Sequence, residues 1–181
     1  TPATRVNFNG NVGYALYTGL RTPGSRESSH VEASVGLDTA FNQEGAVEFQ
    51  LGDTLTRSDR TQNTALSIGV LSLFNSARIA LPIHPGGRAL EFTPAATWSI
   101  ELFDPLAPGQ ISLGGCPLSN PTCNSAIVSA MNYSNVNASL GGRWKFLPKT
   151  ALTGDVSYDW RSYFSSAAGN NGSAFAGLTA N

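Results

Sequence analysis

Residues 5–18, RVNFNGNVGYALYT, change character at every second position. Successive side chains of a β-strand point to opposite faces, so this stretch predicts a strand with one polar and one apolar face. Its fourteen residues exceed the roughly 5–6 of an ordinary strand. The two alternate sets are Arg5, Asn7, Asn9, Asn11, Gly13, Ala15 and Tyr17, and Val6, Phe8, Gly10, Val12, Tyr14, Leu16 and Thr18.

The same alternation recurs along the chain, whereas helical periodicity is hard to find. Short connections rich in Gly or Pro alternate with long ones, and the short ones are QEG (43–45), HPGG (84–87) and LPKT (147–150). We therefore expect an all-β, antiparallel up-and-down fold with its tight turns at one edge. Six further strands are predicted at 30–42, 46–58, 77–83, 89–103, 135–146 and 151–164.

Composition sets broad limits on the function. The chain has 181 residues and a net charge of −1, and 13% of its residues are charged, about half the usual ~25%. No cluster of Lys and Arg suggests a nucleic-acid partner, and no run of about 18 apolar residues predicts a transmembrane helix. We expect one domain over 1–181, with no cofactor.

The strand pattern and the alternating connections together resemble the outer-membrane β-barrel proteins of Gram-negative bacteria, whose strands are apolar outside and polar inside. The resemblance covers essentially the whole chain, and the segment GGRWKFLPKTAL (141–152) looks like turns of larger bacterial barrels. It implies an outer-membrane location, short periplasmic turns, and long extracellular loops, one of them at 104–132. It also implies the lipid bilayer as a partner, with a protein partner at the loops as a further candidate.

A closed sheet can cross hydrocarbon because its strands satisfy one another's backbone hydrogen bonds. On this interpretation, one set of charged side chains faces the barrel lumen. These charges either line a channel constriction or form an ion-pair network that fills a narrow barrel. The set is Arg5, Glu32, Asp38, Glu48, Arg78, Glu91, Glu101, Arg143, Lys145, Asp155, Asp159 and Arg161.

Aromatic residues near the predicted strand ends would form belts at the two lipid interfaces. The members expected there are Trp98, Trp144, Trp160 and Phe164, with Tyr163 and Phe103 near the loop end.

Some residues do not follow this pattern. The phase of the third strand places Asp53 and Arg57 on the lipid side, where a charge is costly. We expect either a position near the outer rim or a β-bulge at Gly52. The apolar run 65–74, inside a predicted loop, either extends two strands or forms a docking surface.

Cysteine and histidine spacing leaves little room for catalysis. Cys116 and Cys123 lie close together in CPLSNPTC, which favours a disulfide-closed loop over free thiols or a metal site. His30 and His84 fall at opposite ends of the predicted strands, and neither GxSxG nor HExxH occurs. We therefore expect no enzymatic activity.

Seven strands cannot close a barrel of the even-numbered bacterial type. Residues 173–181 offer an eighth strand; otherwise the chain is a segment of a larger barrel. The favoured function is a pore or a structural anchor that presents extracellular loops. The alternatives are a secreted β-sandwich or filament subunit that binds partners through its loops, and a lipid-modifying barrel enzyme.

Overall fold

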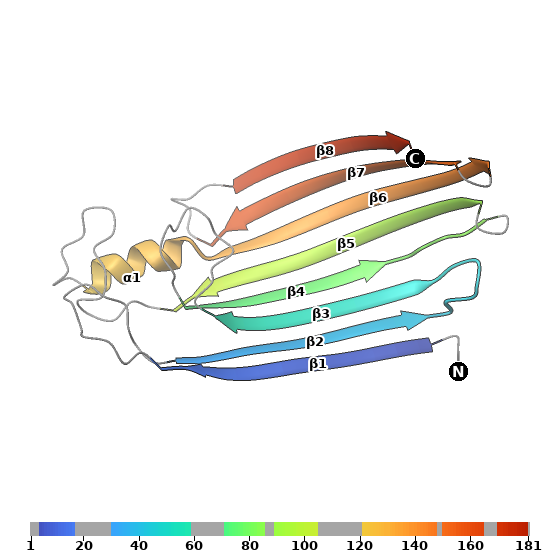
Figure 1. Ribbon diagram of the computed structural model, residues 1–181. Helices are drawn as coiled ribbons and strands as arrows, with labels where there is room; N and C mark the ends of the chain where they lie inside the picture. Colours follow the sequence, from blue (N-terminus) through green and yellow to red (C-terminus); the bar gives the residue numbers. More distant parts are fainter. Residues whose placement is uncertain are drawn as a thin grey trace.

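In the part of the chain that the structure describes, eight strands lie side by side in one sheet, and the helix α1 lies beyond one end of it (Figure 1). The computed structural model describes residues 4–16, 30–58, 71–85, 89–104, 121–147, 150–164 and 170–180. The elements are β1 (Thr4–Ala15), β2 (His30–Phe41), β3 (Phe49–Ser58), β4 (Ser72–Ala80), β5 (Leu90–Phe103), α1 (Pro121–Ala130), β6 (Tyr133–Leu147), β7 (Thr150–Tyr163) and β8 (Asn170–Ala180).

The strands follow one another across the sheet in the order β1 to β8, and each is antiparallel to the next. The predicted all-β, up-and-down arrangement is therefore confirmed. The last strand, β8, covers most of the 173–181 segment. The prediction missed α1, which lies inside the segment expected to be a loop (104–132). Pro121 begins this helix, at a position where a missing backbone N–H leaves no hydrogen bond unmade.

The predicted fourth strand, 77–83, was displaced toward the C-terminus, because β4 covers Ser72–Ala80. Pro82 lacks an N–H and interrupts the regular pairing, which resumes at Ile83 through isolated bridges to Val47 and Phe92. β4 also takes in the last three residues of the apolar run 65–74, so this part extends a strand. Residues 65–70 lie outside the described residues.

The turn between β2 and β3 shows why the QEG connection is tight. Asn42 has a φ of 58°, and its carbonyl accepts a hydrogen bond of 2.9 Å from the Gly45 N–H. The Asn42 side-chain amide also donates to the Val47 carbonyl over 2.7 Å. A Cβ at position 45 would overlap the Asn42 amide, so a larger residue there would displace that side chain and its hydrogen bond to Val47.

Because the strands alternate in direction, the strand ends joined by short connections all lie at one end of the sheet. The strand ends that flank the long intervals lie at the other end. The short edge joins β2 to β3, β4 to β5 and β6 to β7. The strand ends that flank the intervals 16–29, 59–71, 104–132 and 164–169 lie at the opposite end of the sheet, and α1 lies beyond that end (Figure 1).

The sheet is a single layer within the described part of the chain. No second sheet formed by described residues covers either face, and few described apolar side chains are buried, among them those of Ala40, Ala80, Phe103 and Tyr133. Phe8 and Val12, on the edge strand β1, are 73% and 78% exposed. The two layers that a β-sandwich requires are thus not formed by the described strands. Nor do the described residues of β1 and β8 pair with each other, so the sheet is open.

None of the helical segments in the described residues combines the length and apolar character needed to cross a membrane.

Candidate functional site

The strand register sorts the side chains into two faces, because directly paired residues of neighbouring strands point to the same side. Phe8 pairs with Leu37, whereas the preceding residue of β1, Asn7, pairs with Asp38. We call the side that carries Phe8 the apolar face and the side that carries Asn7 the polar face. The row through Phe8 continues across the sheet as Leu37, Asp53, Ala77, Trp98, Val136 and Trp160.

The apolar face carries all three tryptophans of the chain. Trp98, Trp144 and Trp160 are 46%, 53% and 50% exposed. At the short-turn end, the rings of Trp144 and Phe146 lie 5.5 Å apart. The indole N–H of Trp98 donates to the Ser134 hydroxyl over 2.8 Å. This face is therefore a broad apolar surface, not a packed core.

The remaining aromatic residues divide between the faces. Phe164 follows β7 and is exposed. The expectation that Tyr163 and Phe103 belong to the lipid-side belts was wrong, because Tyr163 pairs with Tyr133, which in turn pairs with Glu101. Phe103 is two residues from Glu101 on β5 and so shares its face. Both residues therefore lie on the polar face, at the end nearest α1.

Asp53 and Arg57 do lie on the apolar face. Of the two expected explanations, a β-bulge at Gly52 and a position near the rim, only the second applies, and only to Arg57. Pairing is continuous through Gly52, so there is no bulge. Arg57 is close to the end of β3 and forms an ion pair of 2.7 Å with Asp104, as a position at the rim allows. Asp53, in contrast, is in the middle of β3, where its carboxylate accepts a hydrogen bond of 2.9 Å from the Asn75 amide.

The polar face collects every charged residue that was predicted to face the lumen. The register places those within the strands on this face, and Glu48 joins them by accepting a hydrogen bond of 2.9 Å from Gln50. The twelve are Arg5, Glu32, Asp38, Glu48, Arg78, Glu91, Glu101, Arg143, Lys145, Asp155, Asp159 and Arg161.

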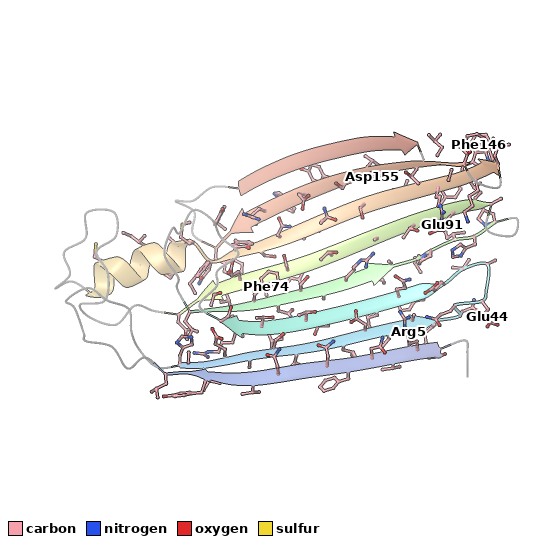
Figure 2. The ribbon with its side chains drawn as sticks, in the orientation of Figure 1. Arg5, Glu44, Phe74, Glu91, Phe146 and Asp155 are labelled. Carbon is pink, nitrogen blue, oxygen red and sulfur yellow. The ribbon has the colours of Figure 1, made fainter. Side chains whose placement is uncertain are left out.

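Hydrogen bonds between neighbouring strands connect parts of this face. Asp159 accepts from the side-chain amides of Asn135, over 3.2 Å, and Asn137, over 2.9 Å. Figure 2 shows the polar side chains along the length of the sheet, with Arg5, Glu91 and Asp155 toward the short-turn end.

A polar cluster beside α1 was not anticipated from the sequence. Glu101 is fully buried and accepts hydrogen bonds from the hydroxyls of Ser72, over 3.1 Å, and Tyr133. The guanidinium of Arg161 lies 4.4 Å from the centre of the Tyr133 ring, within the range of a cation–π interaction. The sequence signal that could have indicated this cluster is the presence of aromatic residues, such as Phe74, on the same face as Glu101. Figure 2 shows Phe74 toward this end of the sheet.

Two shallow hollows occur nearer the short-turn end of the polar face. One, of about 420 Å³, is lined by Arg5, Asp38 and Arg78 among others. The second, of about 250 Å³, is lined by Glu91, Arg143 and Asp155 around glycines of β6 and β7.

The two histidines do not meet. His30 lies 3.5 Å from Glu32 at the long-loop edge, and His84 lies 3.7 Å from Glu91 at the short-turn edge. No group of three His, Cys, Asp or Glu side chains in the described ranges could hold a metal ion.

The predicted Cys116–Cys123 bond remains a prediction. Cys123 lies in α1, whereas Cys116 is outside the described residues. Among the residues that are described, no cysteine is free.

No protein-family model, curated protein or solved structure matches this chain.

Proposed function

We propose that this chain forms the wall, or part of the wall, of a β-barrel in the outer membrane of a Gram-negative bacterium, and that the barrel acts as a pore. One observation carries the proposal. The seven consecutive antiparallel strands β1 to β7 present an apolar face that no described element covers. In water such a face favours aggregation. Lipid acyl chains could cover it without breaking backbone hydrogen bonds, because neighbouring strands already pair their N–H and C=O groups with one another.

The dimensions fit a bilayer. The strands contain nine to fifteen residues, and a tilted strand needs about 9–11 to cross the hydrocarbon. Phe41 and Phe49, whose rings are 6.0 Å apart, lie at the short-turn end with Trp144 and Phe146. Rings in these positions suit a lipid interface.

The edge strands point to additional strands. β1 and β8 each leave one side without a described neighbour, and an edge of this length is a liability in any solvent. On our proposal the edges are satisfied either by pairing with each other or by further strands of a larger barrel.

The polar face favours a water-lined pore over a barrel filled with ion pairs. Two acid–base contacts on this face involve the histidines, His30 with Glu32 and His84 with Glu91. Arg5, Arg78 and Arg143 are exposed and form no ion pair with a described residue. Charges that remain solvated in this way are expected where water fills the interior.

The alternatives have weaker support. A β-sandwich needs a second layer, which the described strands do not form. A lipid-modifying barrel enzyme that uses serine and histidine needs a hydroxyl nucleophile beside a histidine. The predicted disulfide remains part of our proposal, as a closure of the extracellular segment 116–123.

The test is reconstitution of the purified protein into planar lipid bilayers, with single-channel currents recorded in KCl. We expect discrete conductance steps and a gel band whose mobility changes on heating. A compact monomer in the aqueous fraction without detergent would contradict the barrel. A membrane-inserted, heat-modifiable protein without conductance would replace the pore by a structural anchor.

A further inference from the structure

Two arginines line the same hollow on the polar face. Arg5 comes from β1 and Arg78 from β4, three strands away, and both contribute to the hollow of about 420 Å³. Ala40, beside Arg5, and Gly52, beside Arg78, lie between the two arginines. These two small residues leave room between the two long side chains, and Gln50, beside Ala40, and Asp38, beside Gly52, complete this part of the lining.

Neither guanidinium is committed to a partner in the described part of the chain. The described arginines with a side-chain partner are Arg57, which pairs with Asp104, and Arg161, which lies over the Tyr133 ring. Arg5 and Arg78 form no such contact with a described residue and are exposed. Each guanidinium carries five N–H donors in a planar fork that matches carboxylate and phosphate oxygens.

One carboxylate also lines the hollow. Asp38 leans over Gly52, where its Oδ1 is 3.0 Å from the position that a Cβ would occupy. It forms no ion pair with a described residue. The charges around the hollow therefore sum to about +1, and the Thr54 and Ser76 side chains add neutral hydrogen-bonding groups.

The second hollow provides a contrast on the same face. Glu91, Asp155 and Arg143 surround it, so its charges sum to about −1. An anion that samples the polar face should therefore favour the first hollow over the second.

We propose that the hollow between Arg5 and Arg78 is a binding site for small oxyanions, whose carboxylate or phosphate group bridges the two guanidinium groups. The inference deepens the proposed function, since in a pore the site would select anionic solutes. The two ideas fail separately, because binding to the folded protein requires no conductance.

The test is a titration of the full protein in detergent micelles, followed through the ¹⁵N-labelled arginine Nε–H resonances. The probes are inorganic phosphate and acetate, each added at constant ionic strength against chloride. We expect saturable shifts at two arginines. Arg5→Gln and Arg78→Gln should each weaken binding by about tenfold, the usual effect of losing one charge-assisted hydrogen bond.

Two further variants sharpen the result. Asp38→Asn removes the negative charge from the hollow and should tighten binding severalfold. The matched control, Arg143→Gln, removes an exposed arginine of the same face outside the hollow and should leave binding unchanged. All four positions are exposed, so the variants are expected to fold.

Saturation by both probes would assign the site to oxyanions in general, and saturation by phosphate alone would narrow it to phosphate groups. Shifts that stay linear, or an equal loss of affinity in Arg143→Gln, would overturn the site. Saturable binding without conductance would keep the site and reject the pore, whereas conductance without saturable binding would do the reverse.

Discussion

The two faces of the sheet are built from the same strands in the same register, yet their side chains interact differently. On the polar face, neighbouring strands exchange side-chain hydrogen bonds, as when Asn137 donates to Asp159 over 2.9 Å. The apolar face also has such bonds, as from Trp98 to Ser134 over 2.8 Å, but it consists mainly of large uncovered side chains such as that of Phe8. Alternation of polar and apolar side chains along each strand is therefore enough to give a single sheet two different surfaces. The polar surface requires water or polar partners, and the apolar surface requires an apolar environment.

The largest difference in stability between the two faces is expected when an arginine is introduced on each of them. Leu140 is at the centre of β6 on the apolar face, and its neighbour Ser139 is on the polar face. Leu140→Arg should lower the free energy of unfolding from lipid by about 2–4 kcal/mol, and the control Ser139→Arg by less than about 0.5 kcal/mol. Urea unfolding in lipid vesicles measures both. Equal losses would mean that the faces do not differ in solvent.

The next effect concerns the buried cluster beside α1. Tyr133→Phe removes a donor from the buried Glu101 carboxylate and should cost about 1–3 kcal/mol. Tyr163→Phe is the control, because it removes a hydroxyl from the neighbouring ring, whose centre is 6.0 Å away. Unfolding in urea is again the measurement. If the control loses as much as Tyr133→Phe, the hydrogen bond to Glu101 is not what stabilises this end of the polar face.

A smaller effect tests close packing on the polar face. The Asn9 side chain covers Gly36, and a Cβ there would lie 2.6 Å from Asn9 Oδ1. We expect Gly36→Ala to cost about 1 kcal/mol and Asn9→Ala to relieve much of that cost in a double-mutant cycle. Gly13→Ala on the same face is the control, since its Cβ would meet nothing within 4 Å. A cycle without coupling would show that the Asn9 side chain does not rest on Gly36.

The smallest expected effect concerns the exception on the apolar face. Asp53→Leu replaces a charge at mid-strand and should raise the free energy of unfolding from lipid by about 1 kcal/mol, because Asp is less costly there than Arg or Lys. Asp155→Leu, on the polar face, should bring no gain. A loss of stability in Asp53→Leu would mean that the bond from Asn75 outweighs the cost of exposing the carboxylate to lipid.

Much of the sheet could be predicted because the alternation in each strand fixes which residues share a face. Residues 5–18 alone predicted β1 and both of its surfaces, and the positions of Gly and Pro predicted the short turns. The twelve charged residues fell on one face for the same reason. The boundaries of β4 were missed because the sequence does not show how far pairing extends before Pro82 interrupts it.

Other features depend on contacts that no local pattern encodes. Nothing in the period of β5 distinguishes the buried Glu101 from the partly exposed Glu91, because the burial of Glu101 comes from neighbouring strands and their aromatic residues. The Arg5–Arg78 hollow likewise requires the register of four strands. The helix α1 was overlooked because its ten residues lack a clear amphipathic period.

The central claim, that the apolar face contacts lipid, can be tested on the unaltered protein. All three tryptophans, Trp98, Trp144 and Trp160, lie on that face. After reconstitution, we predict that brominated lipids quench their fluorescence strongly, while aqueous acrylamide quenches it weakly. Strong quenching by acrylamide with none by the brominated lipids would place the apolar face away from acyl chains and contradict the membrane barrel.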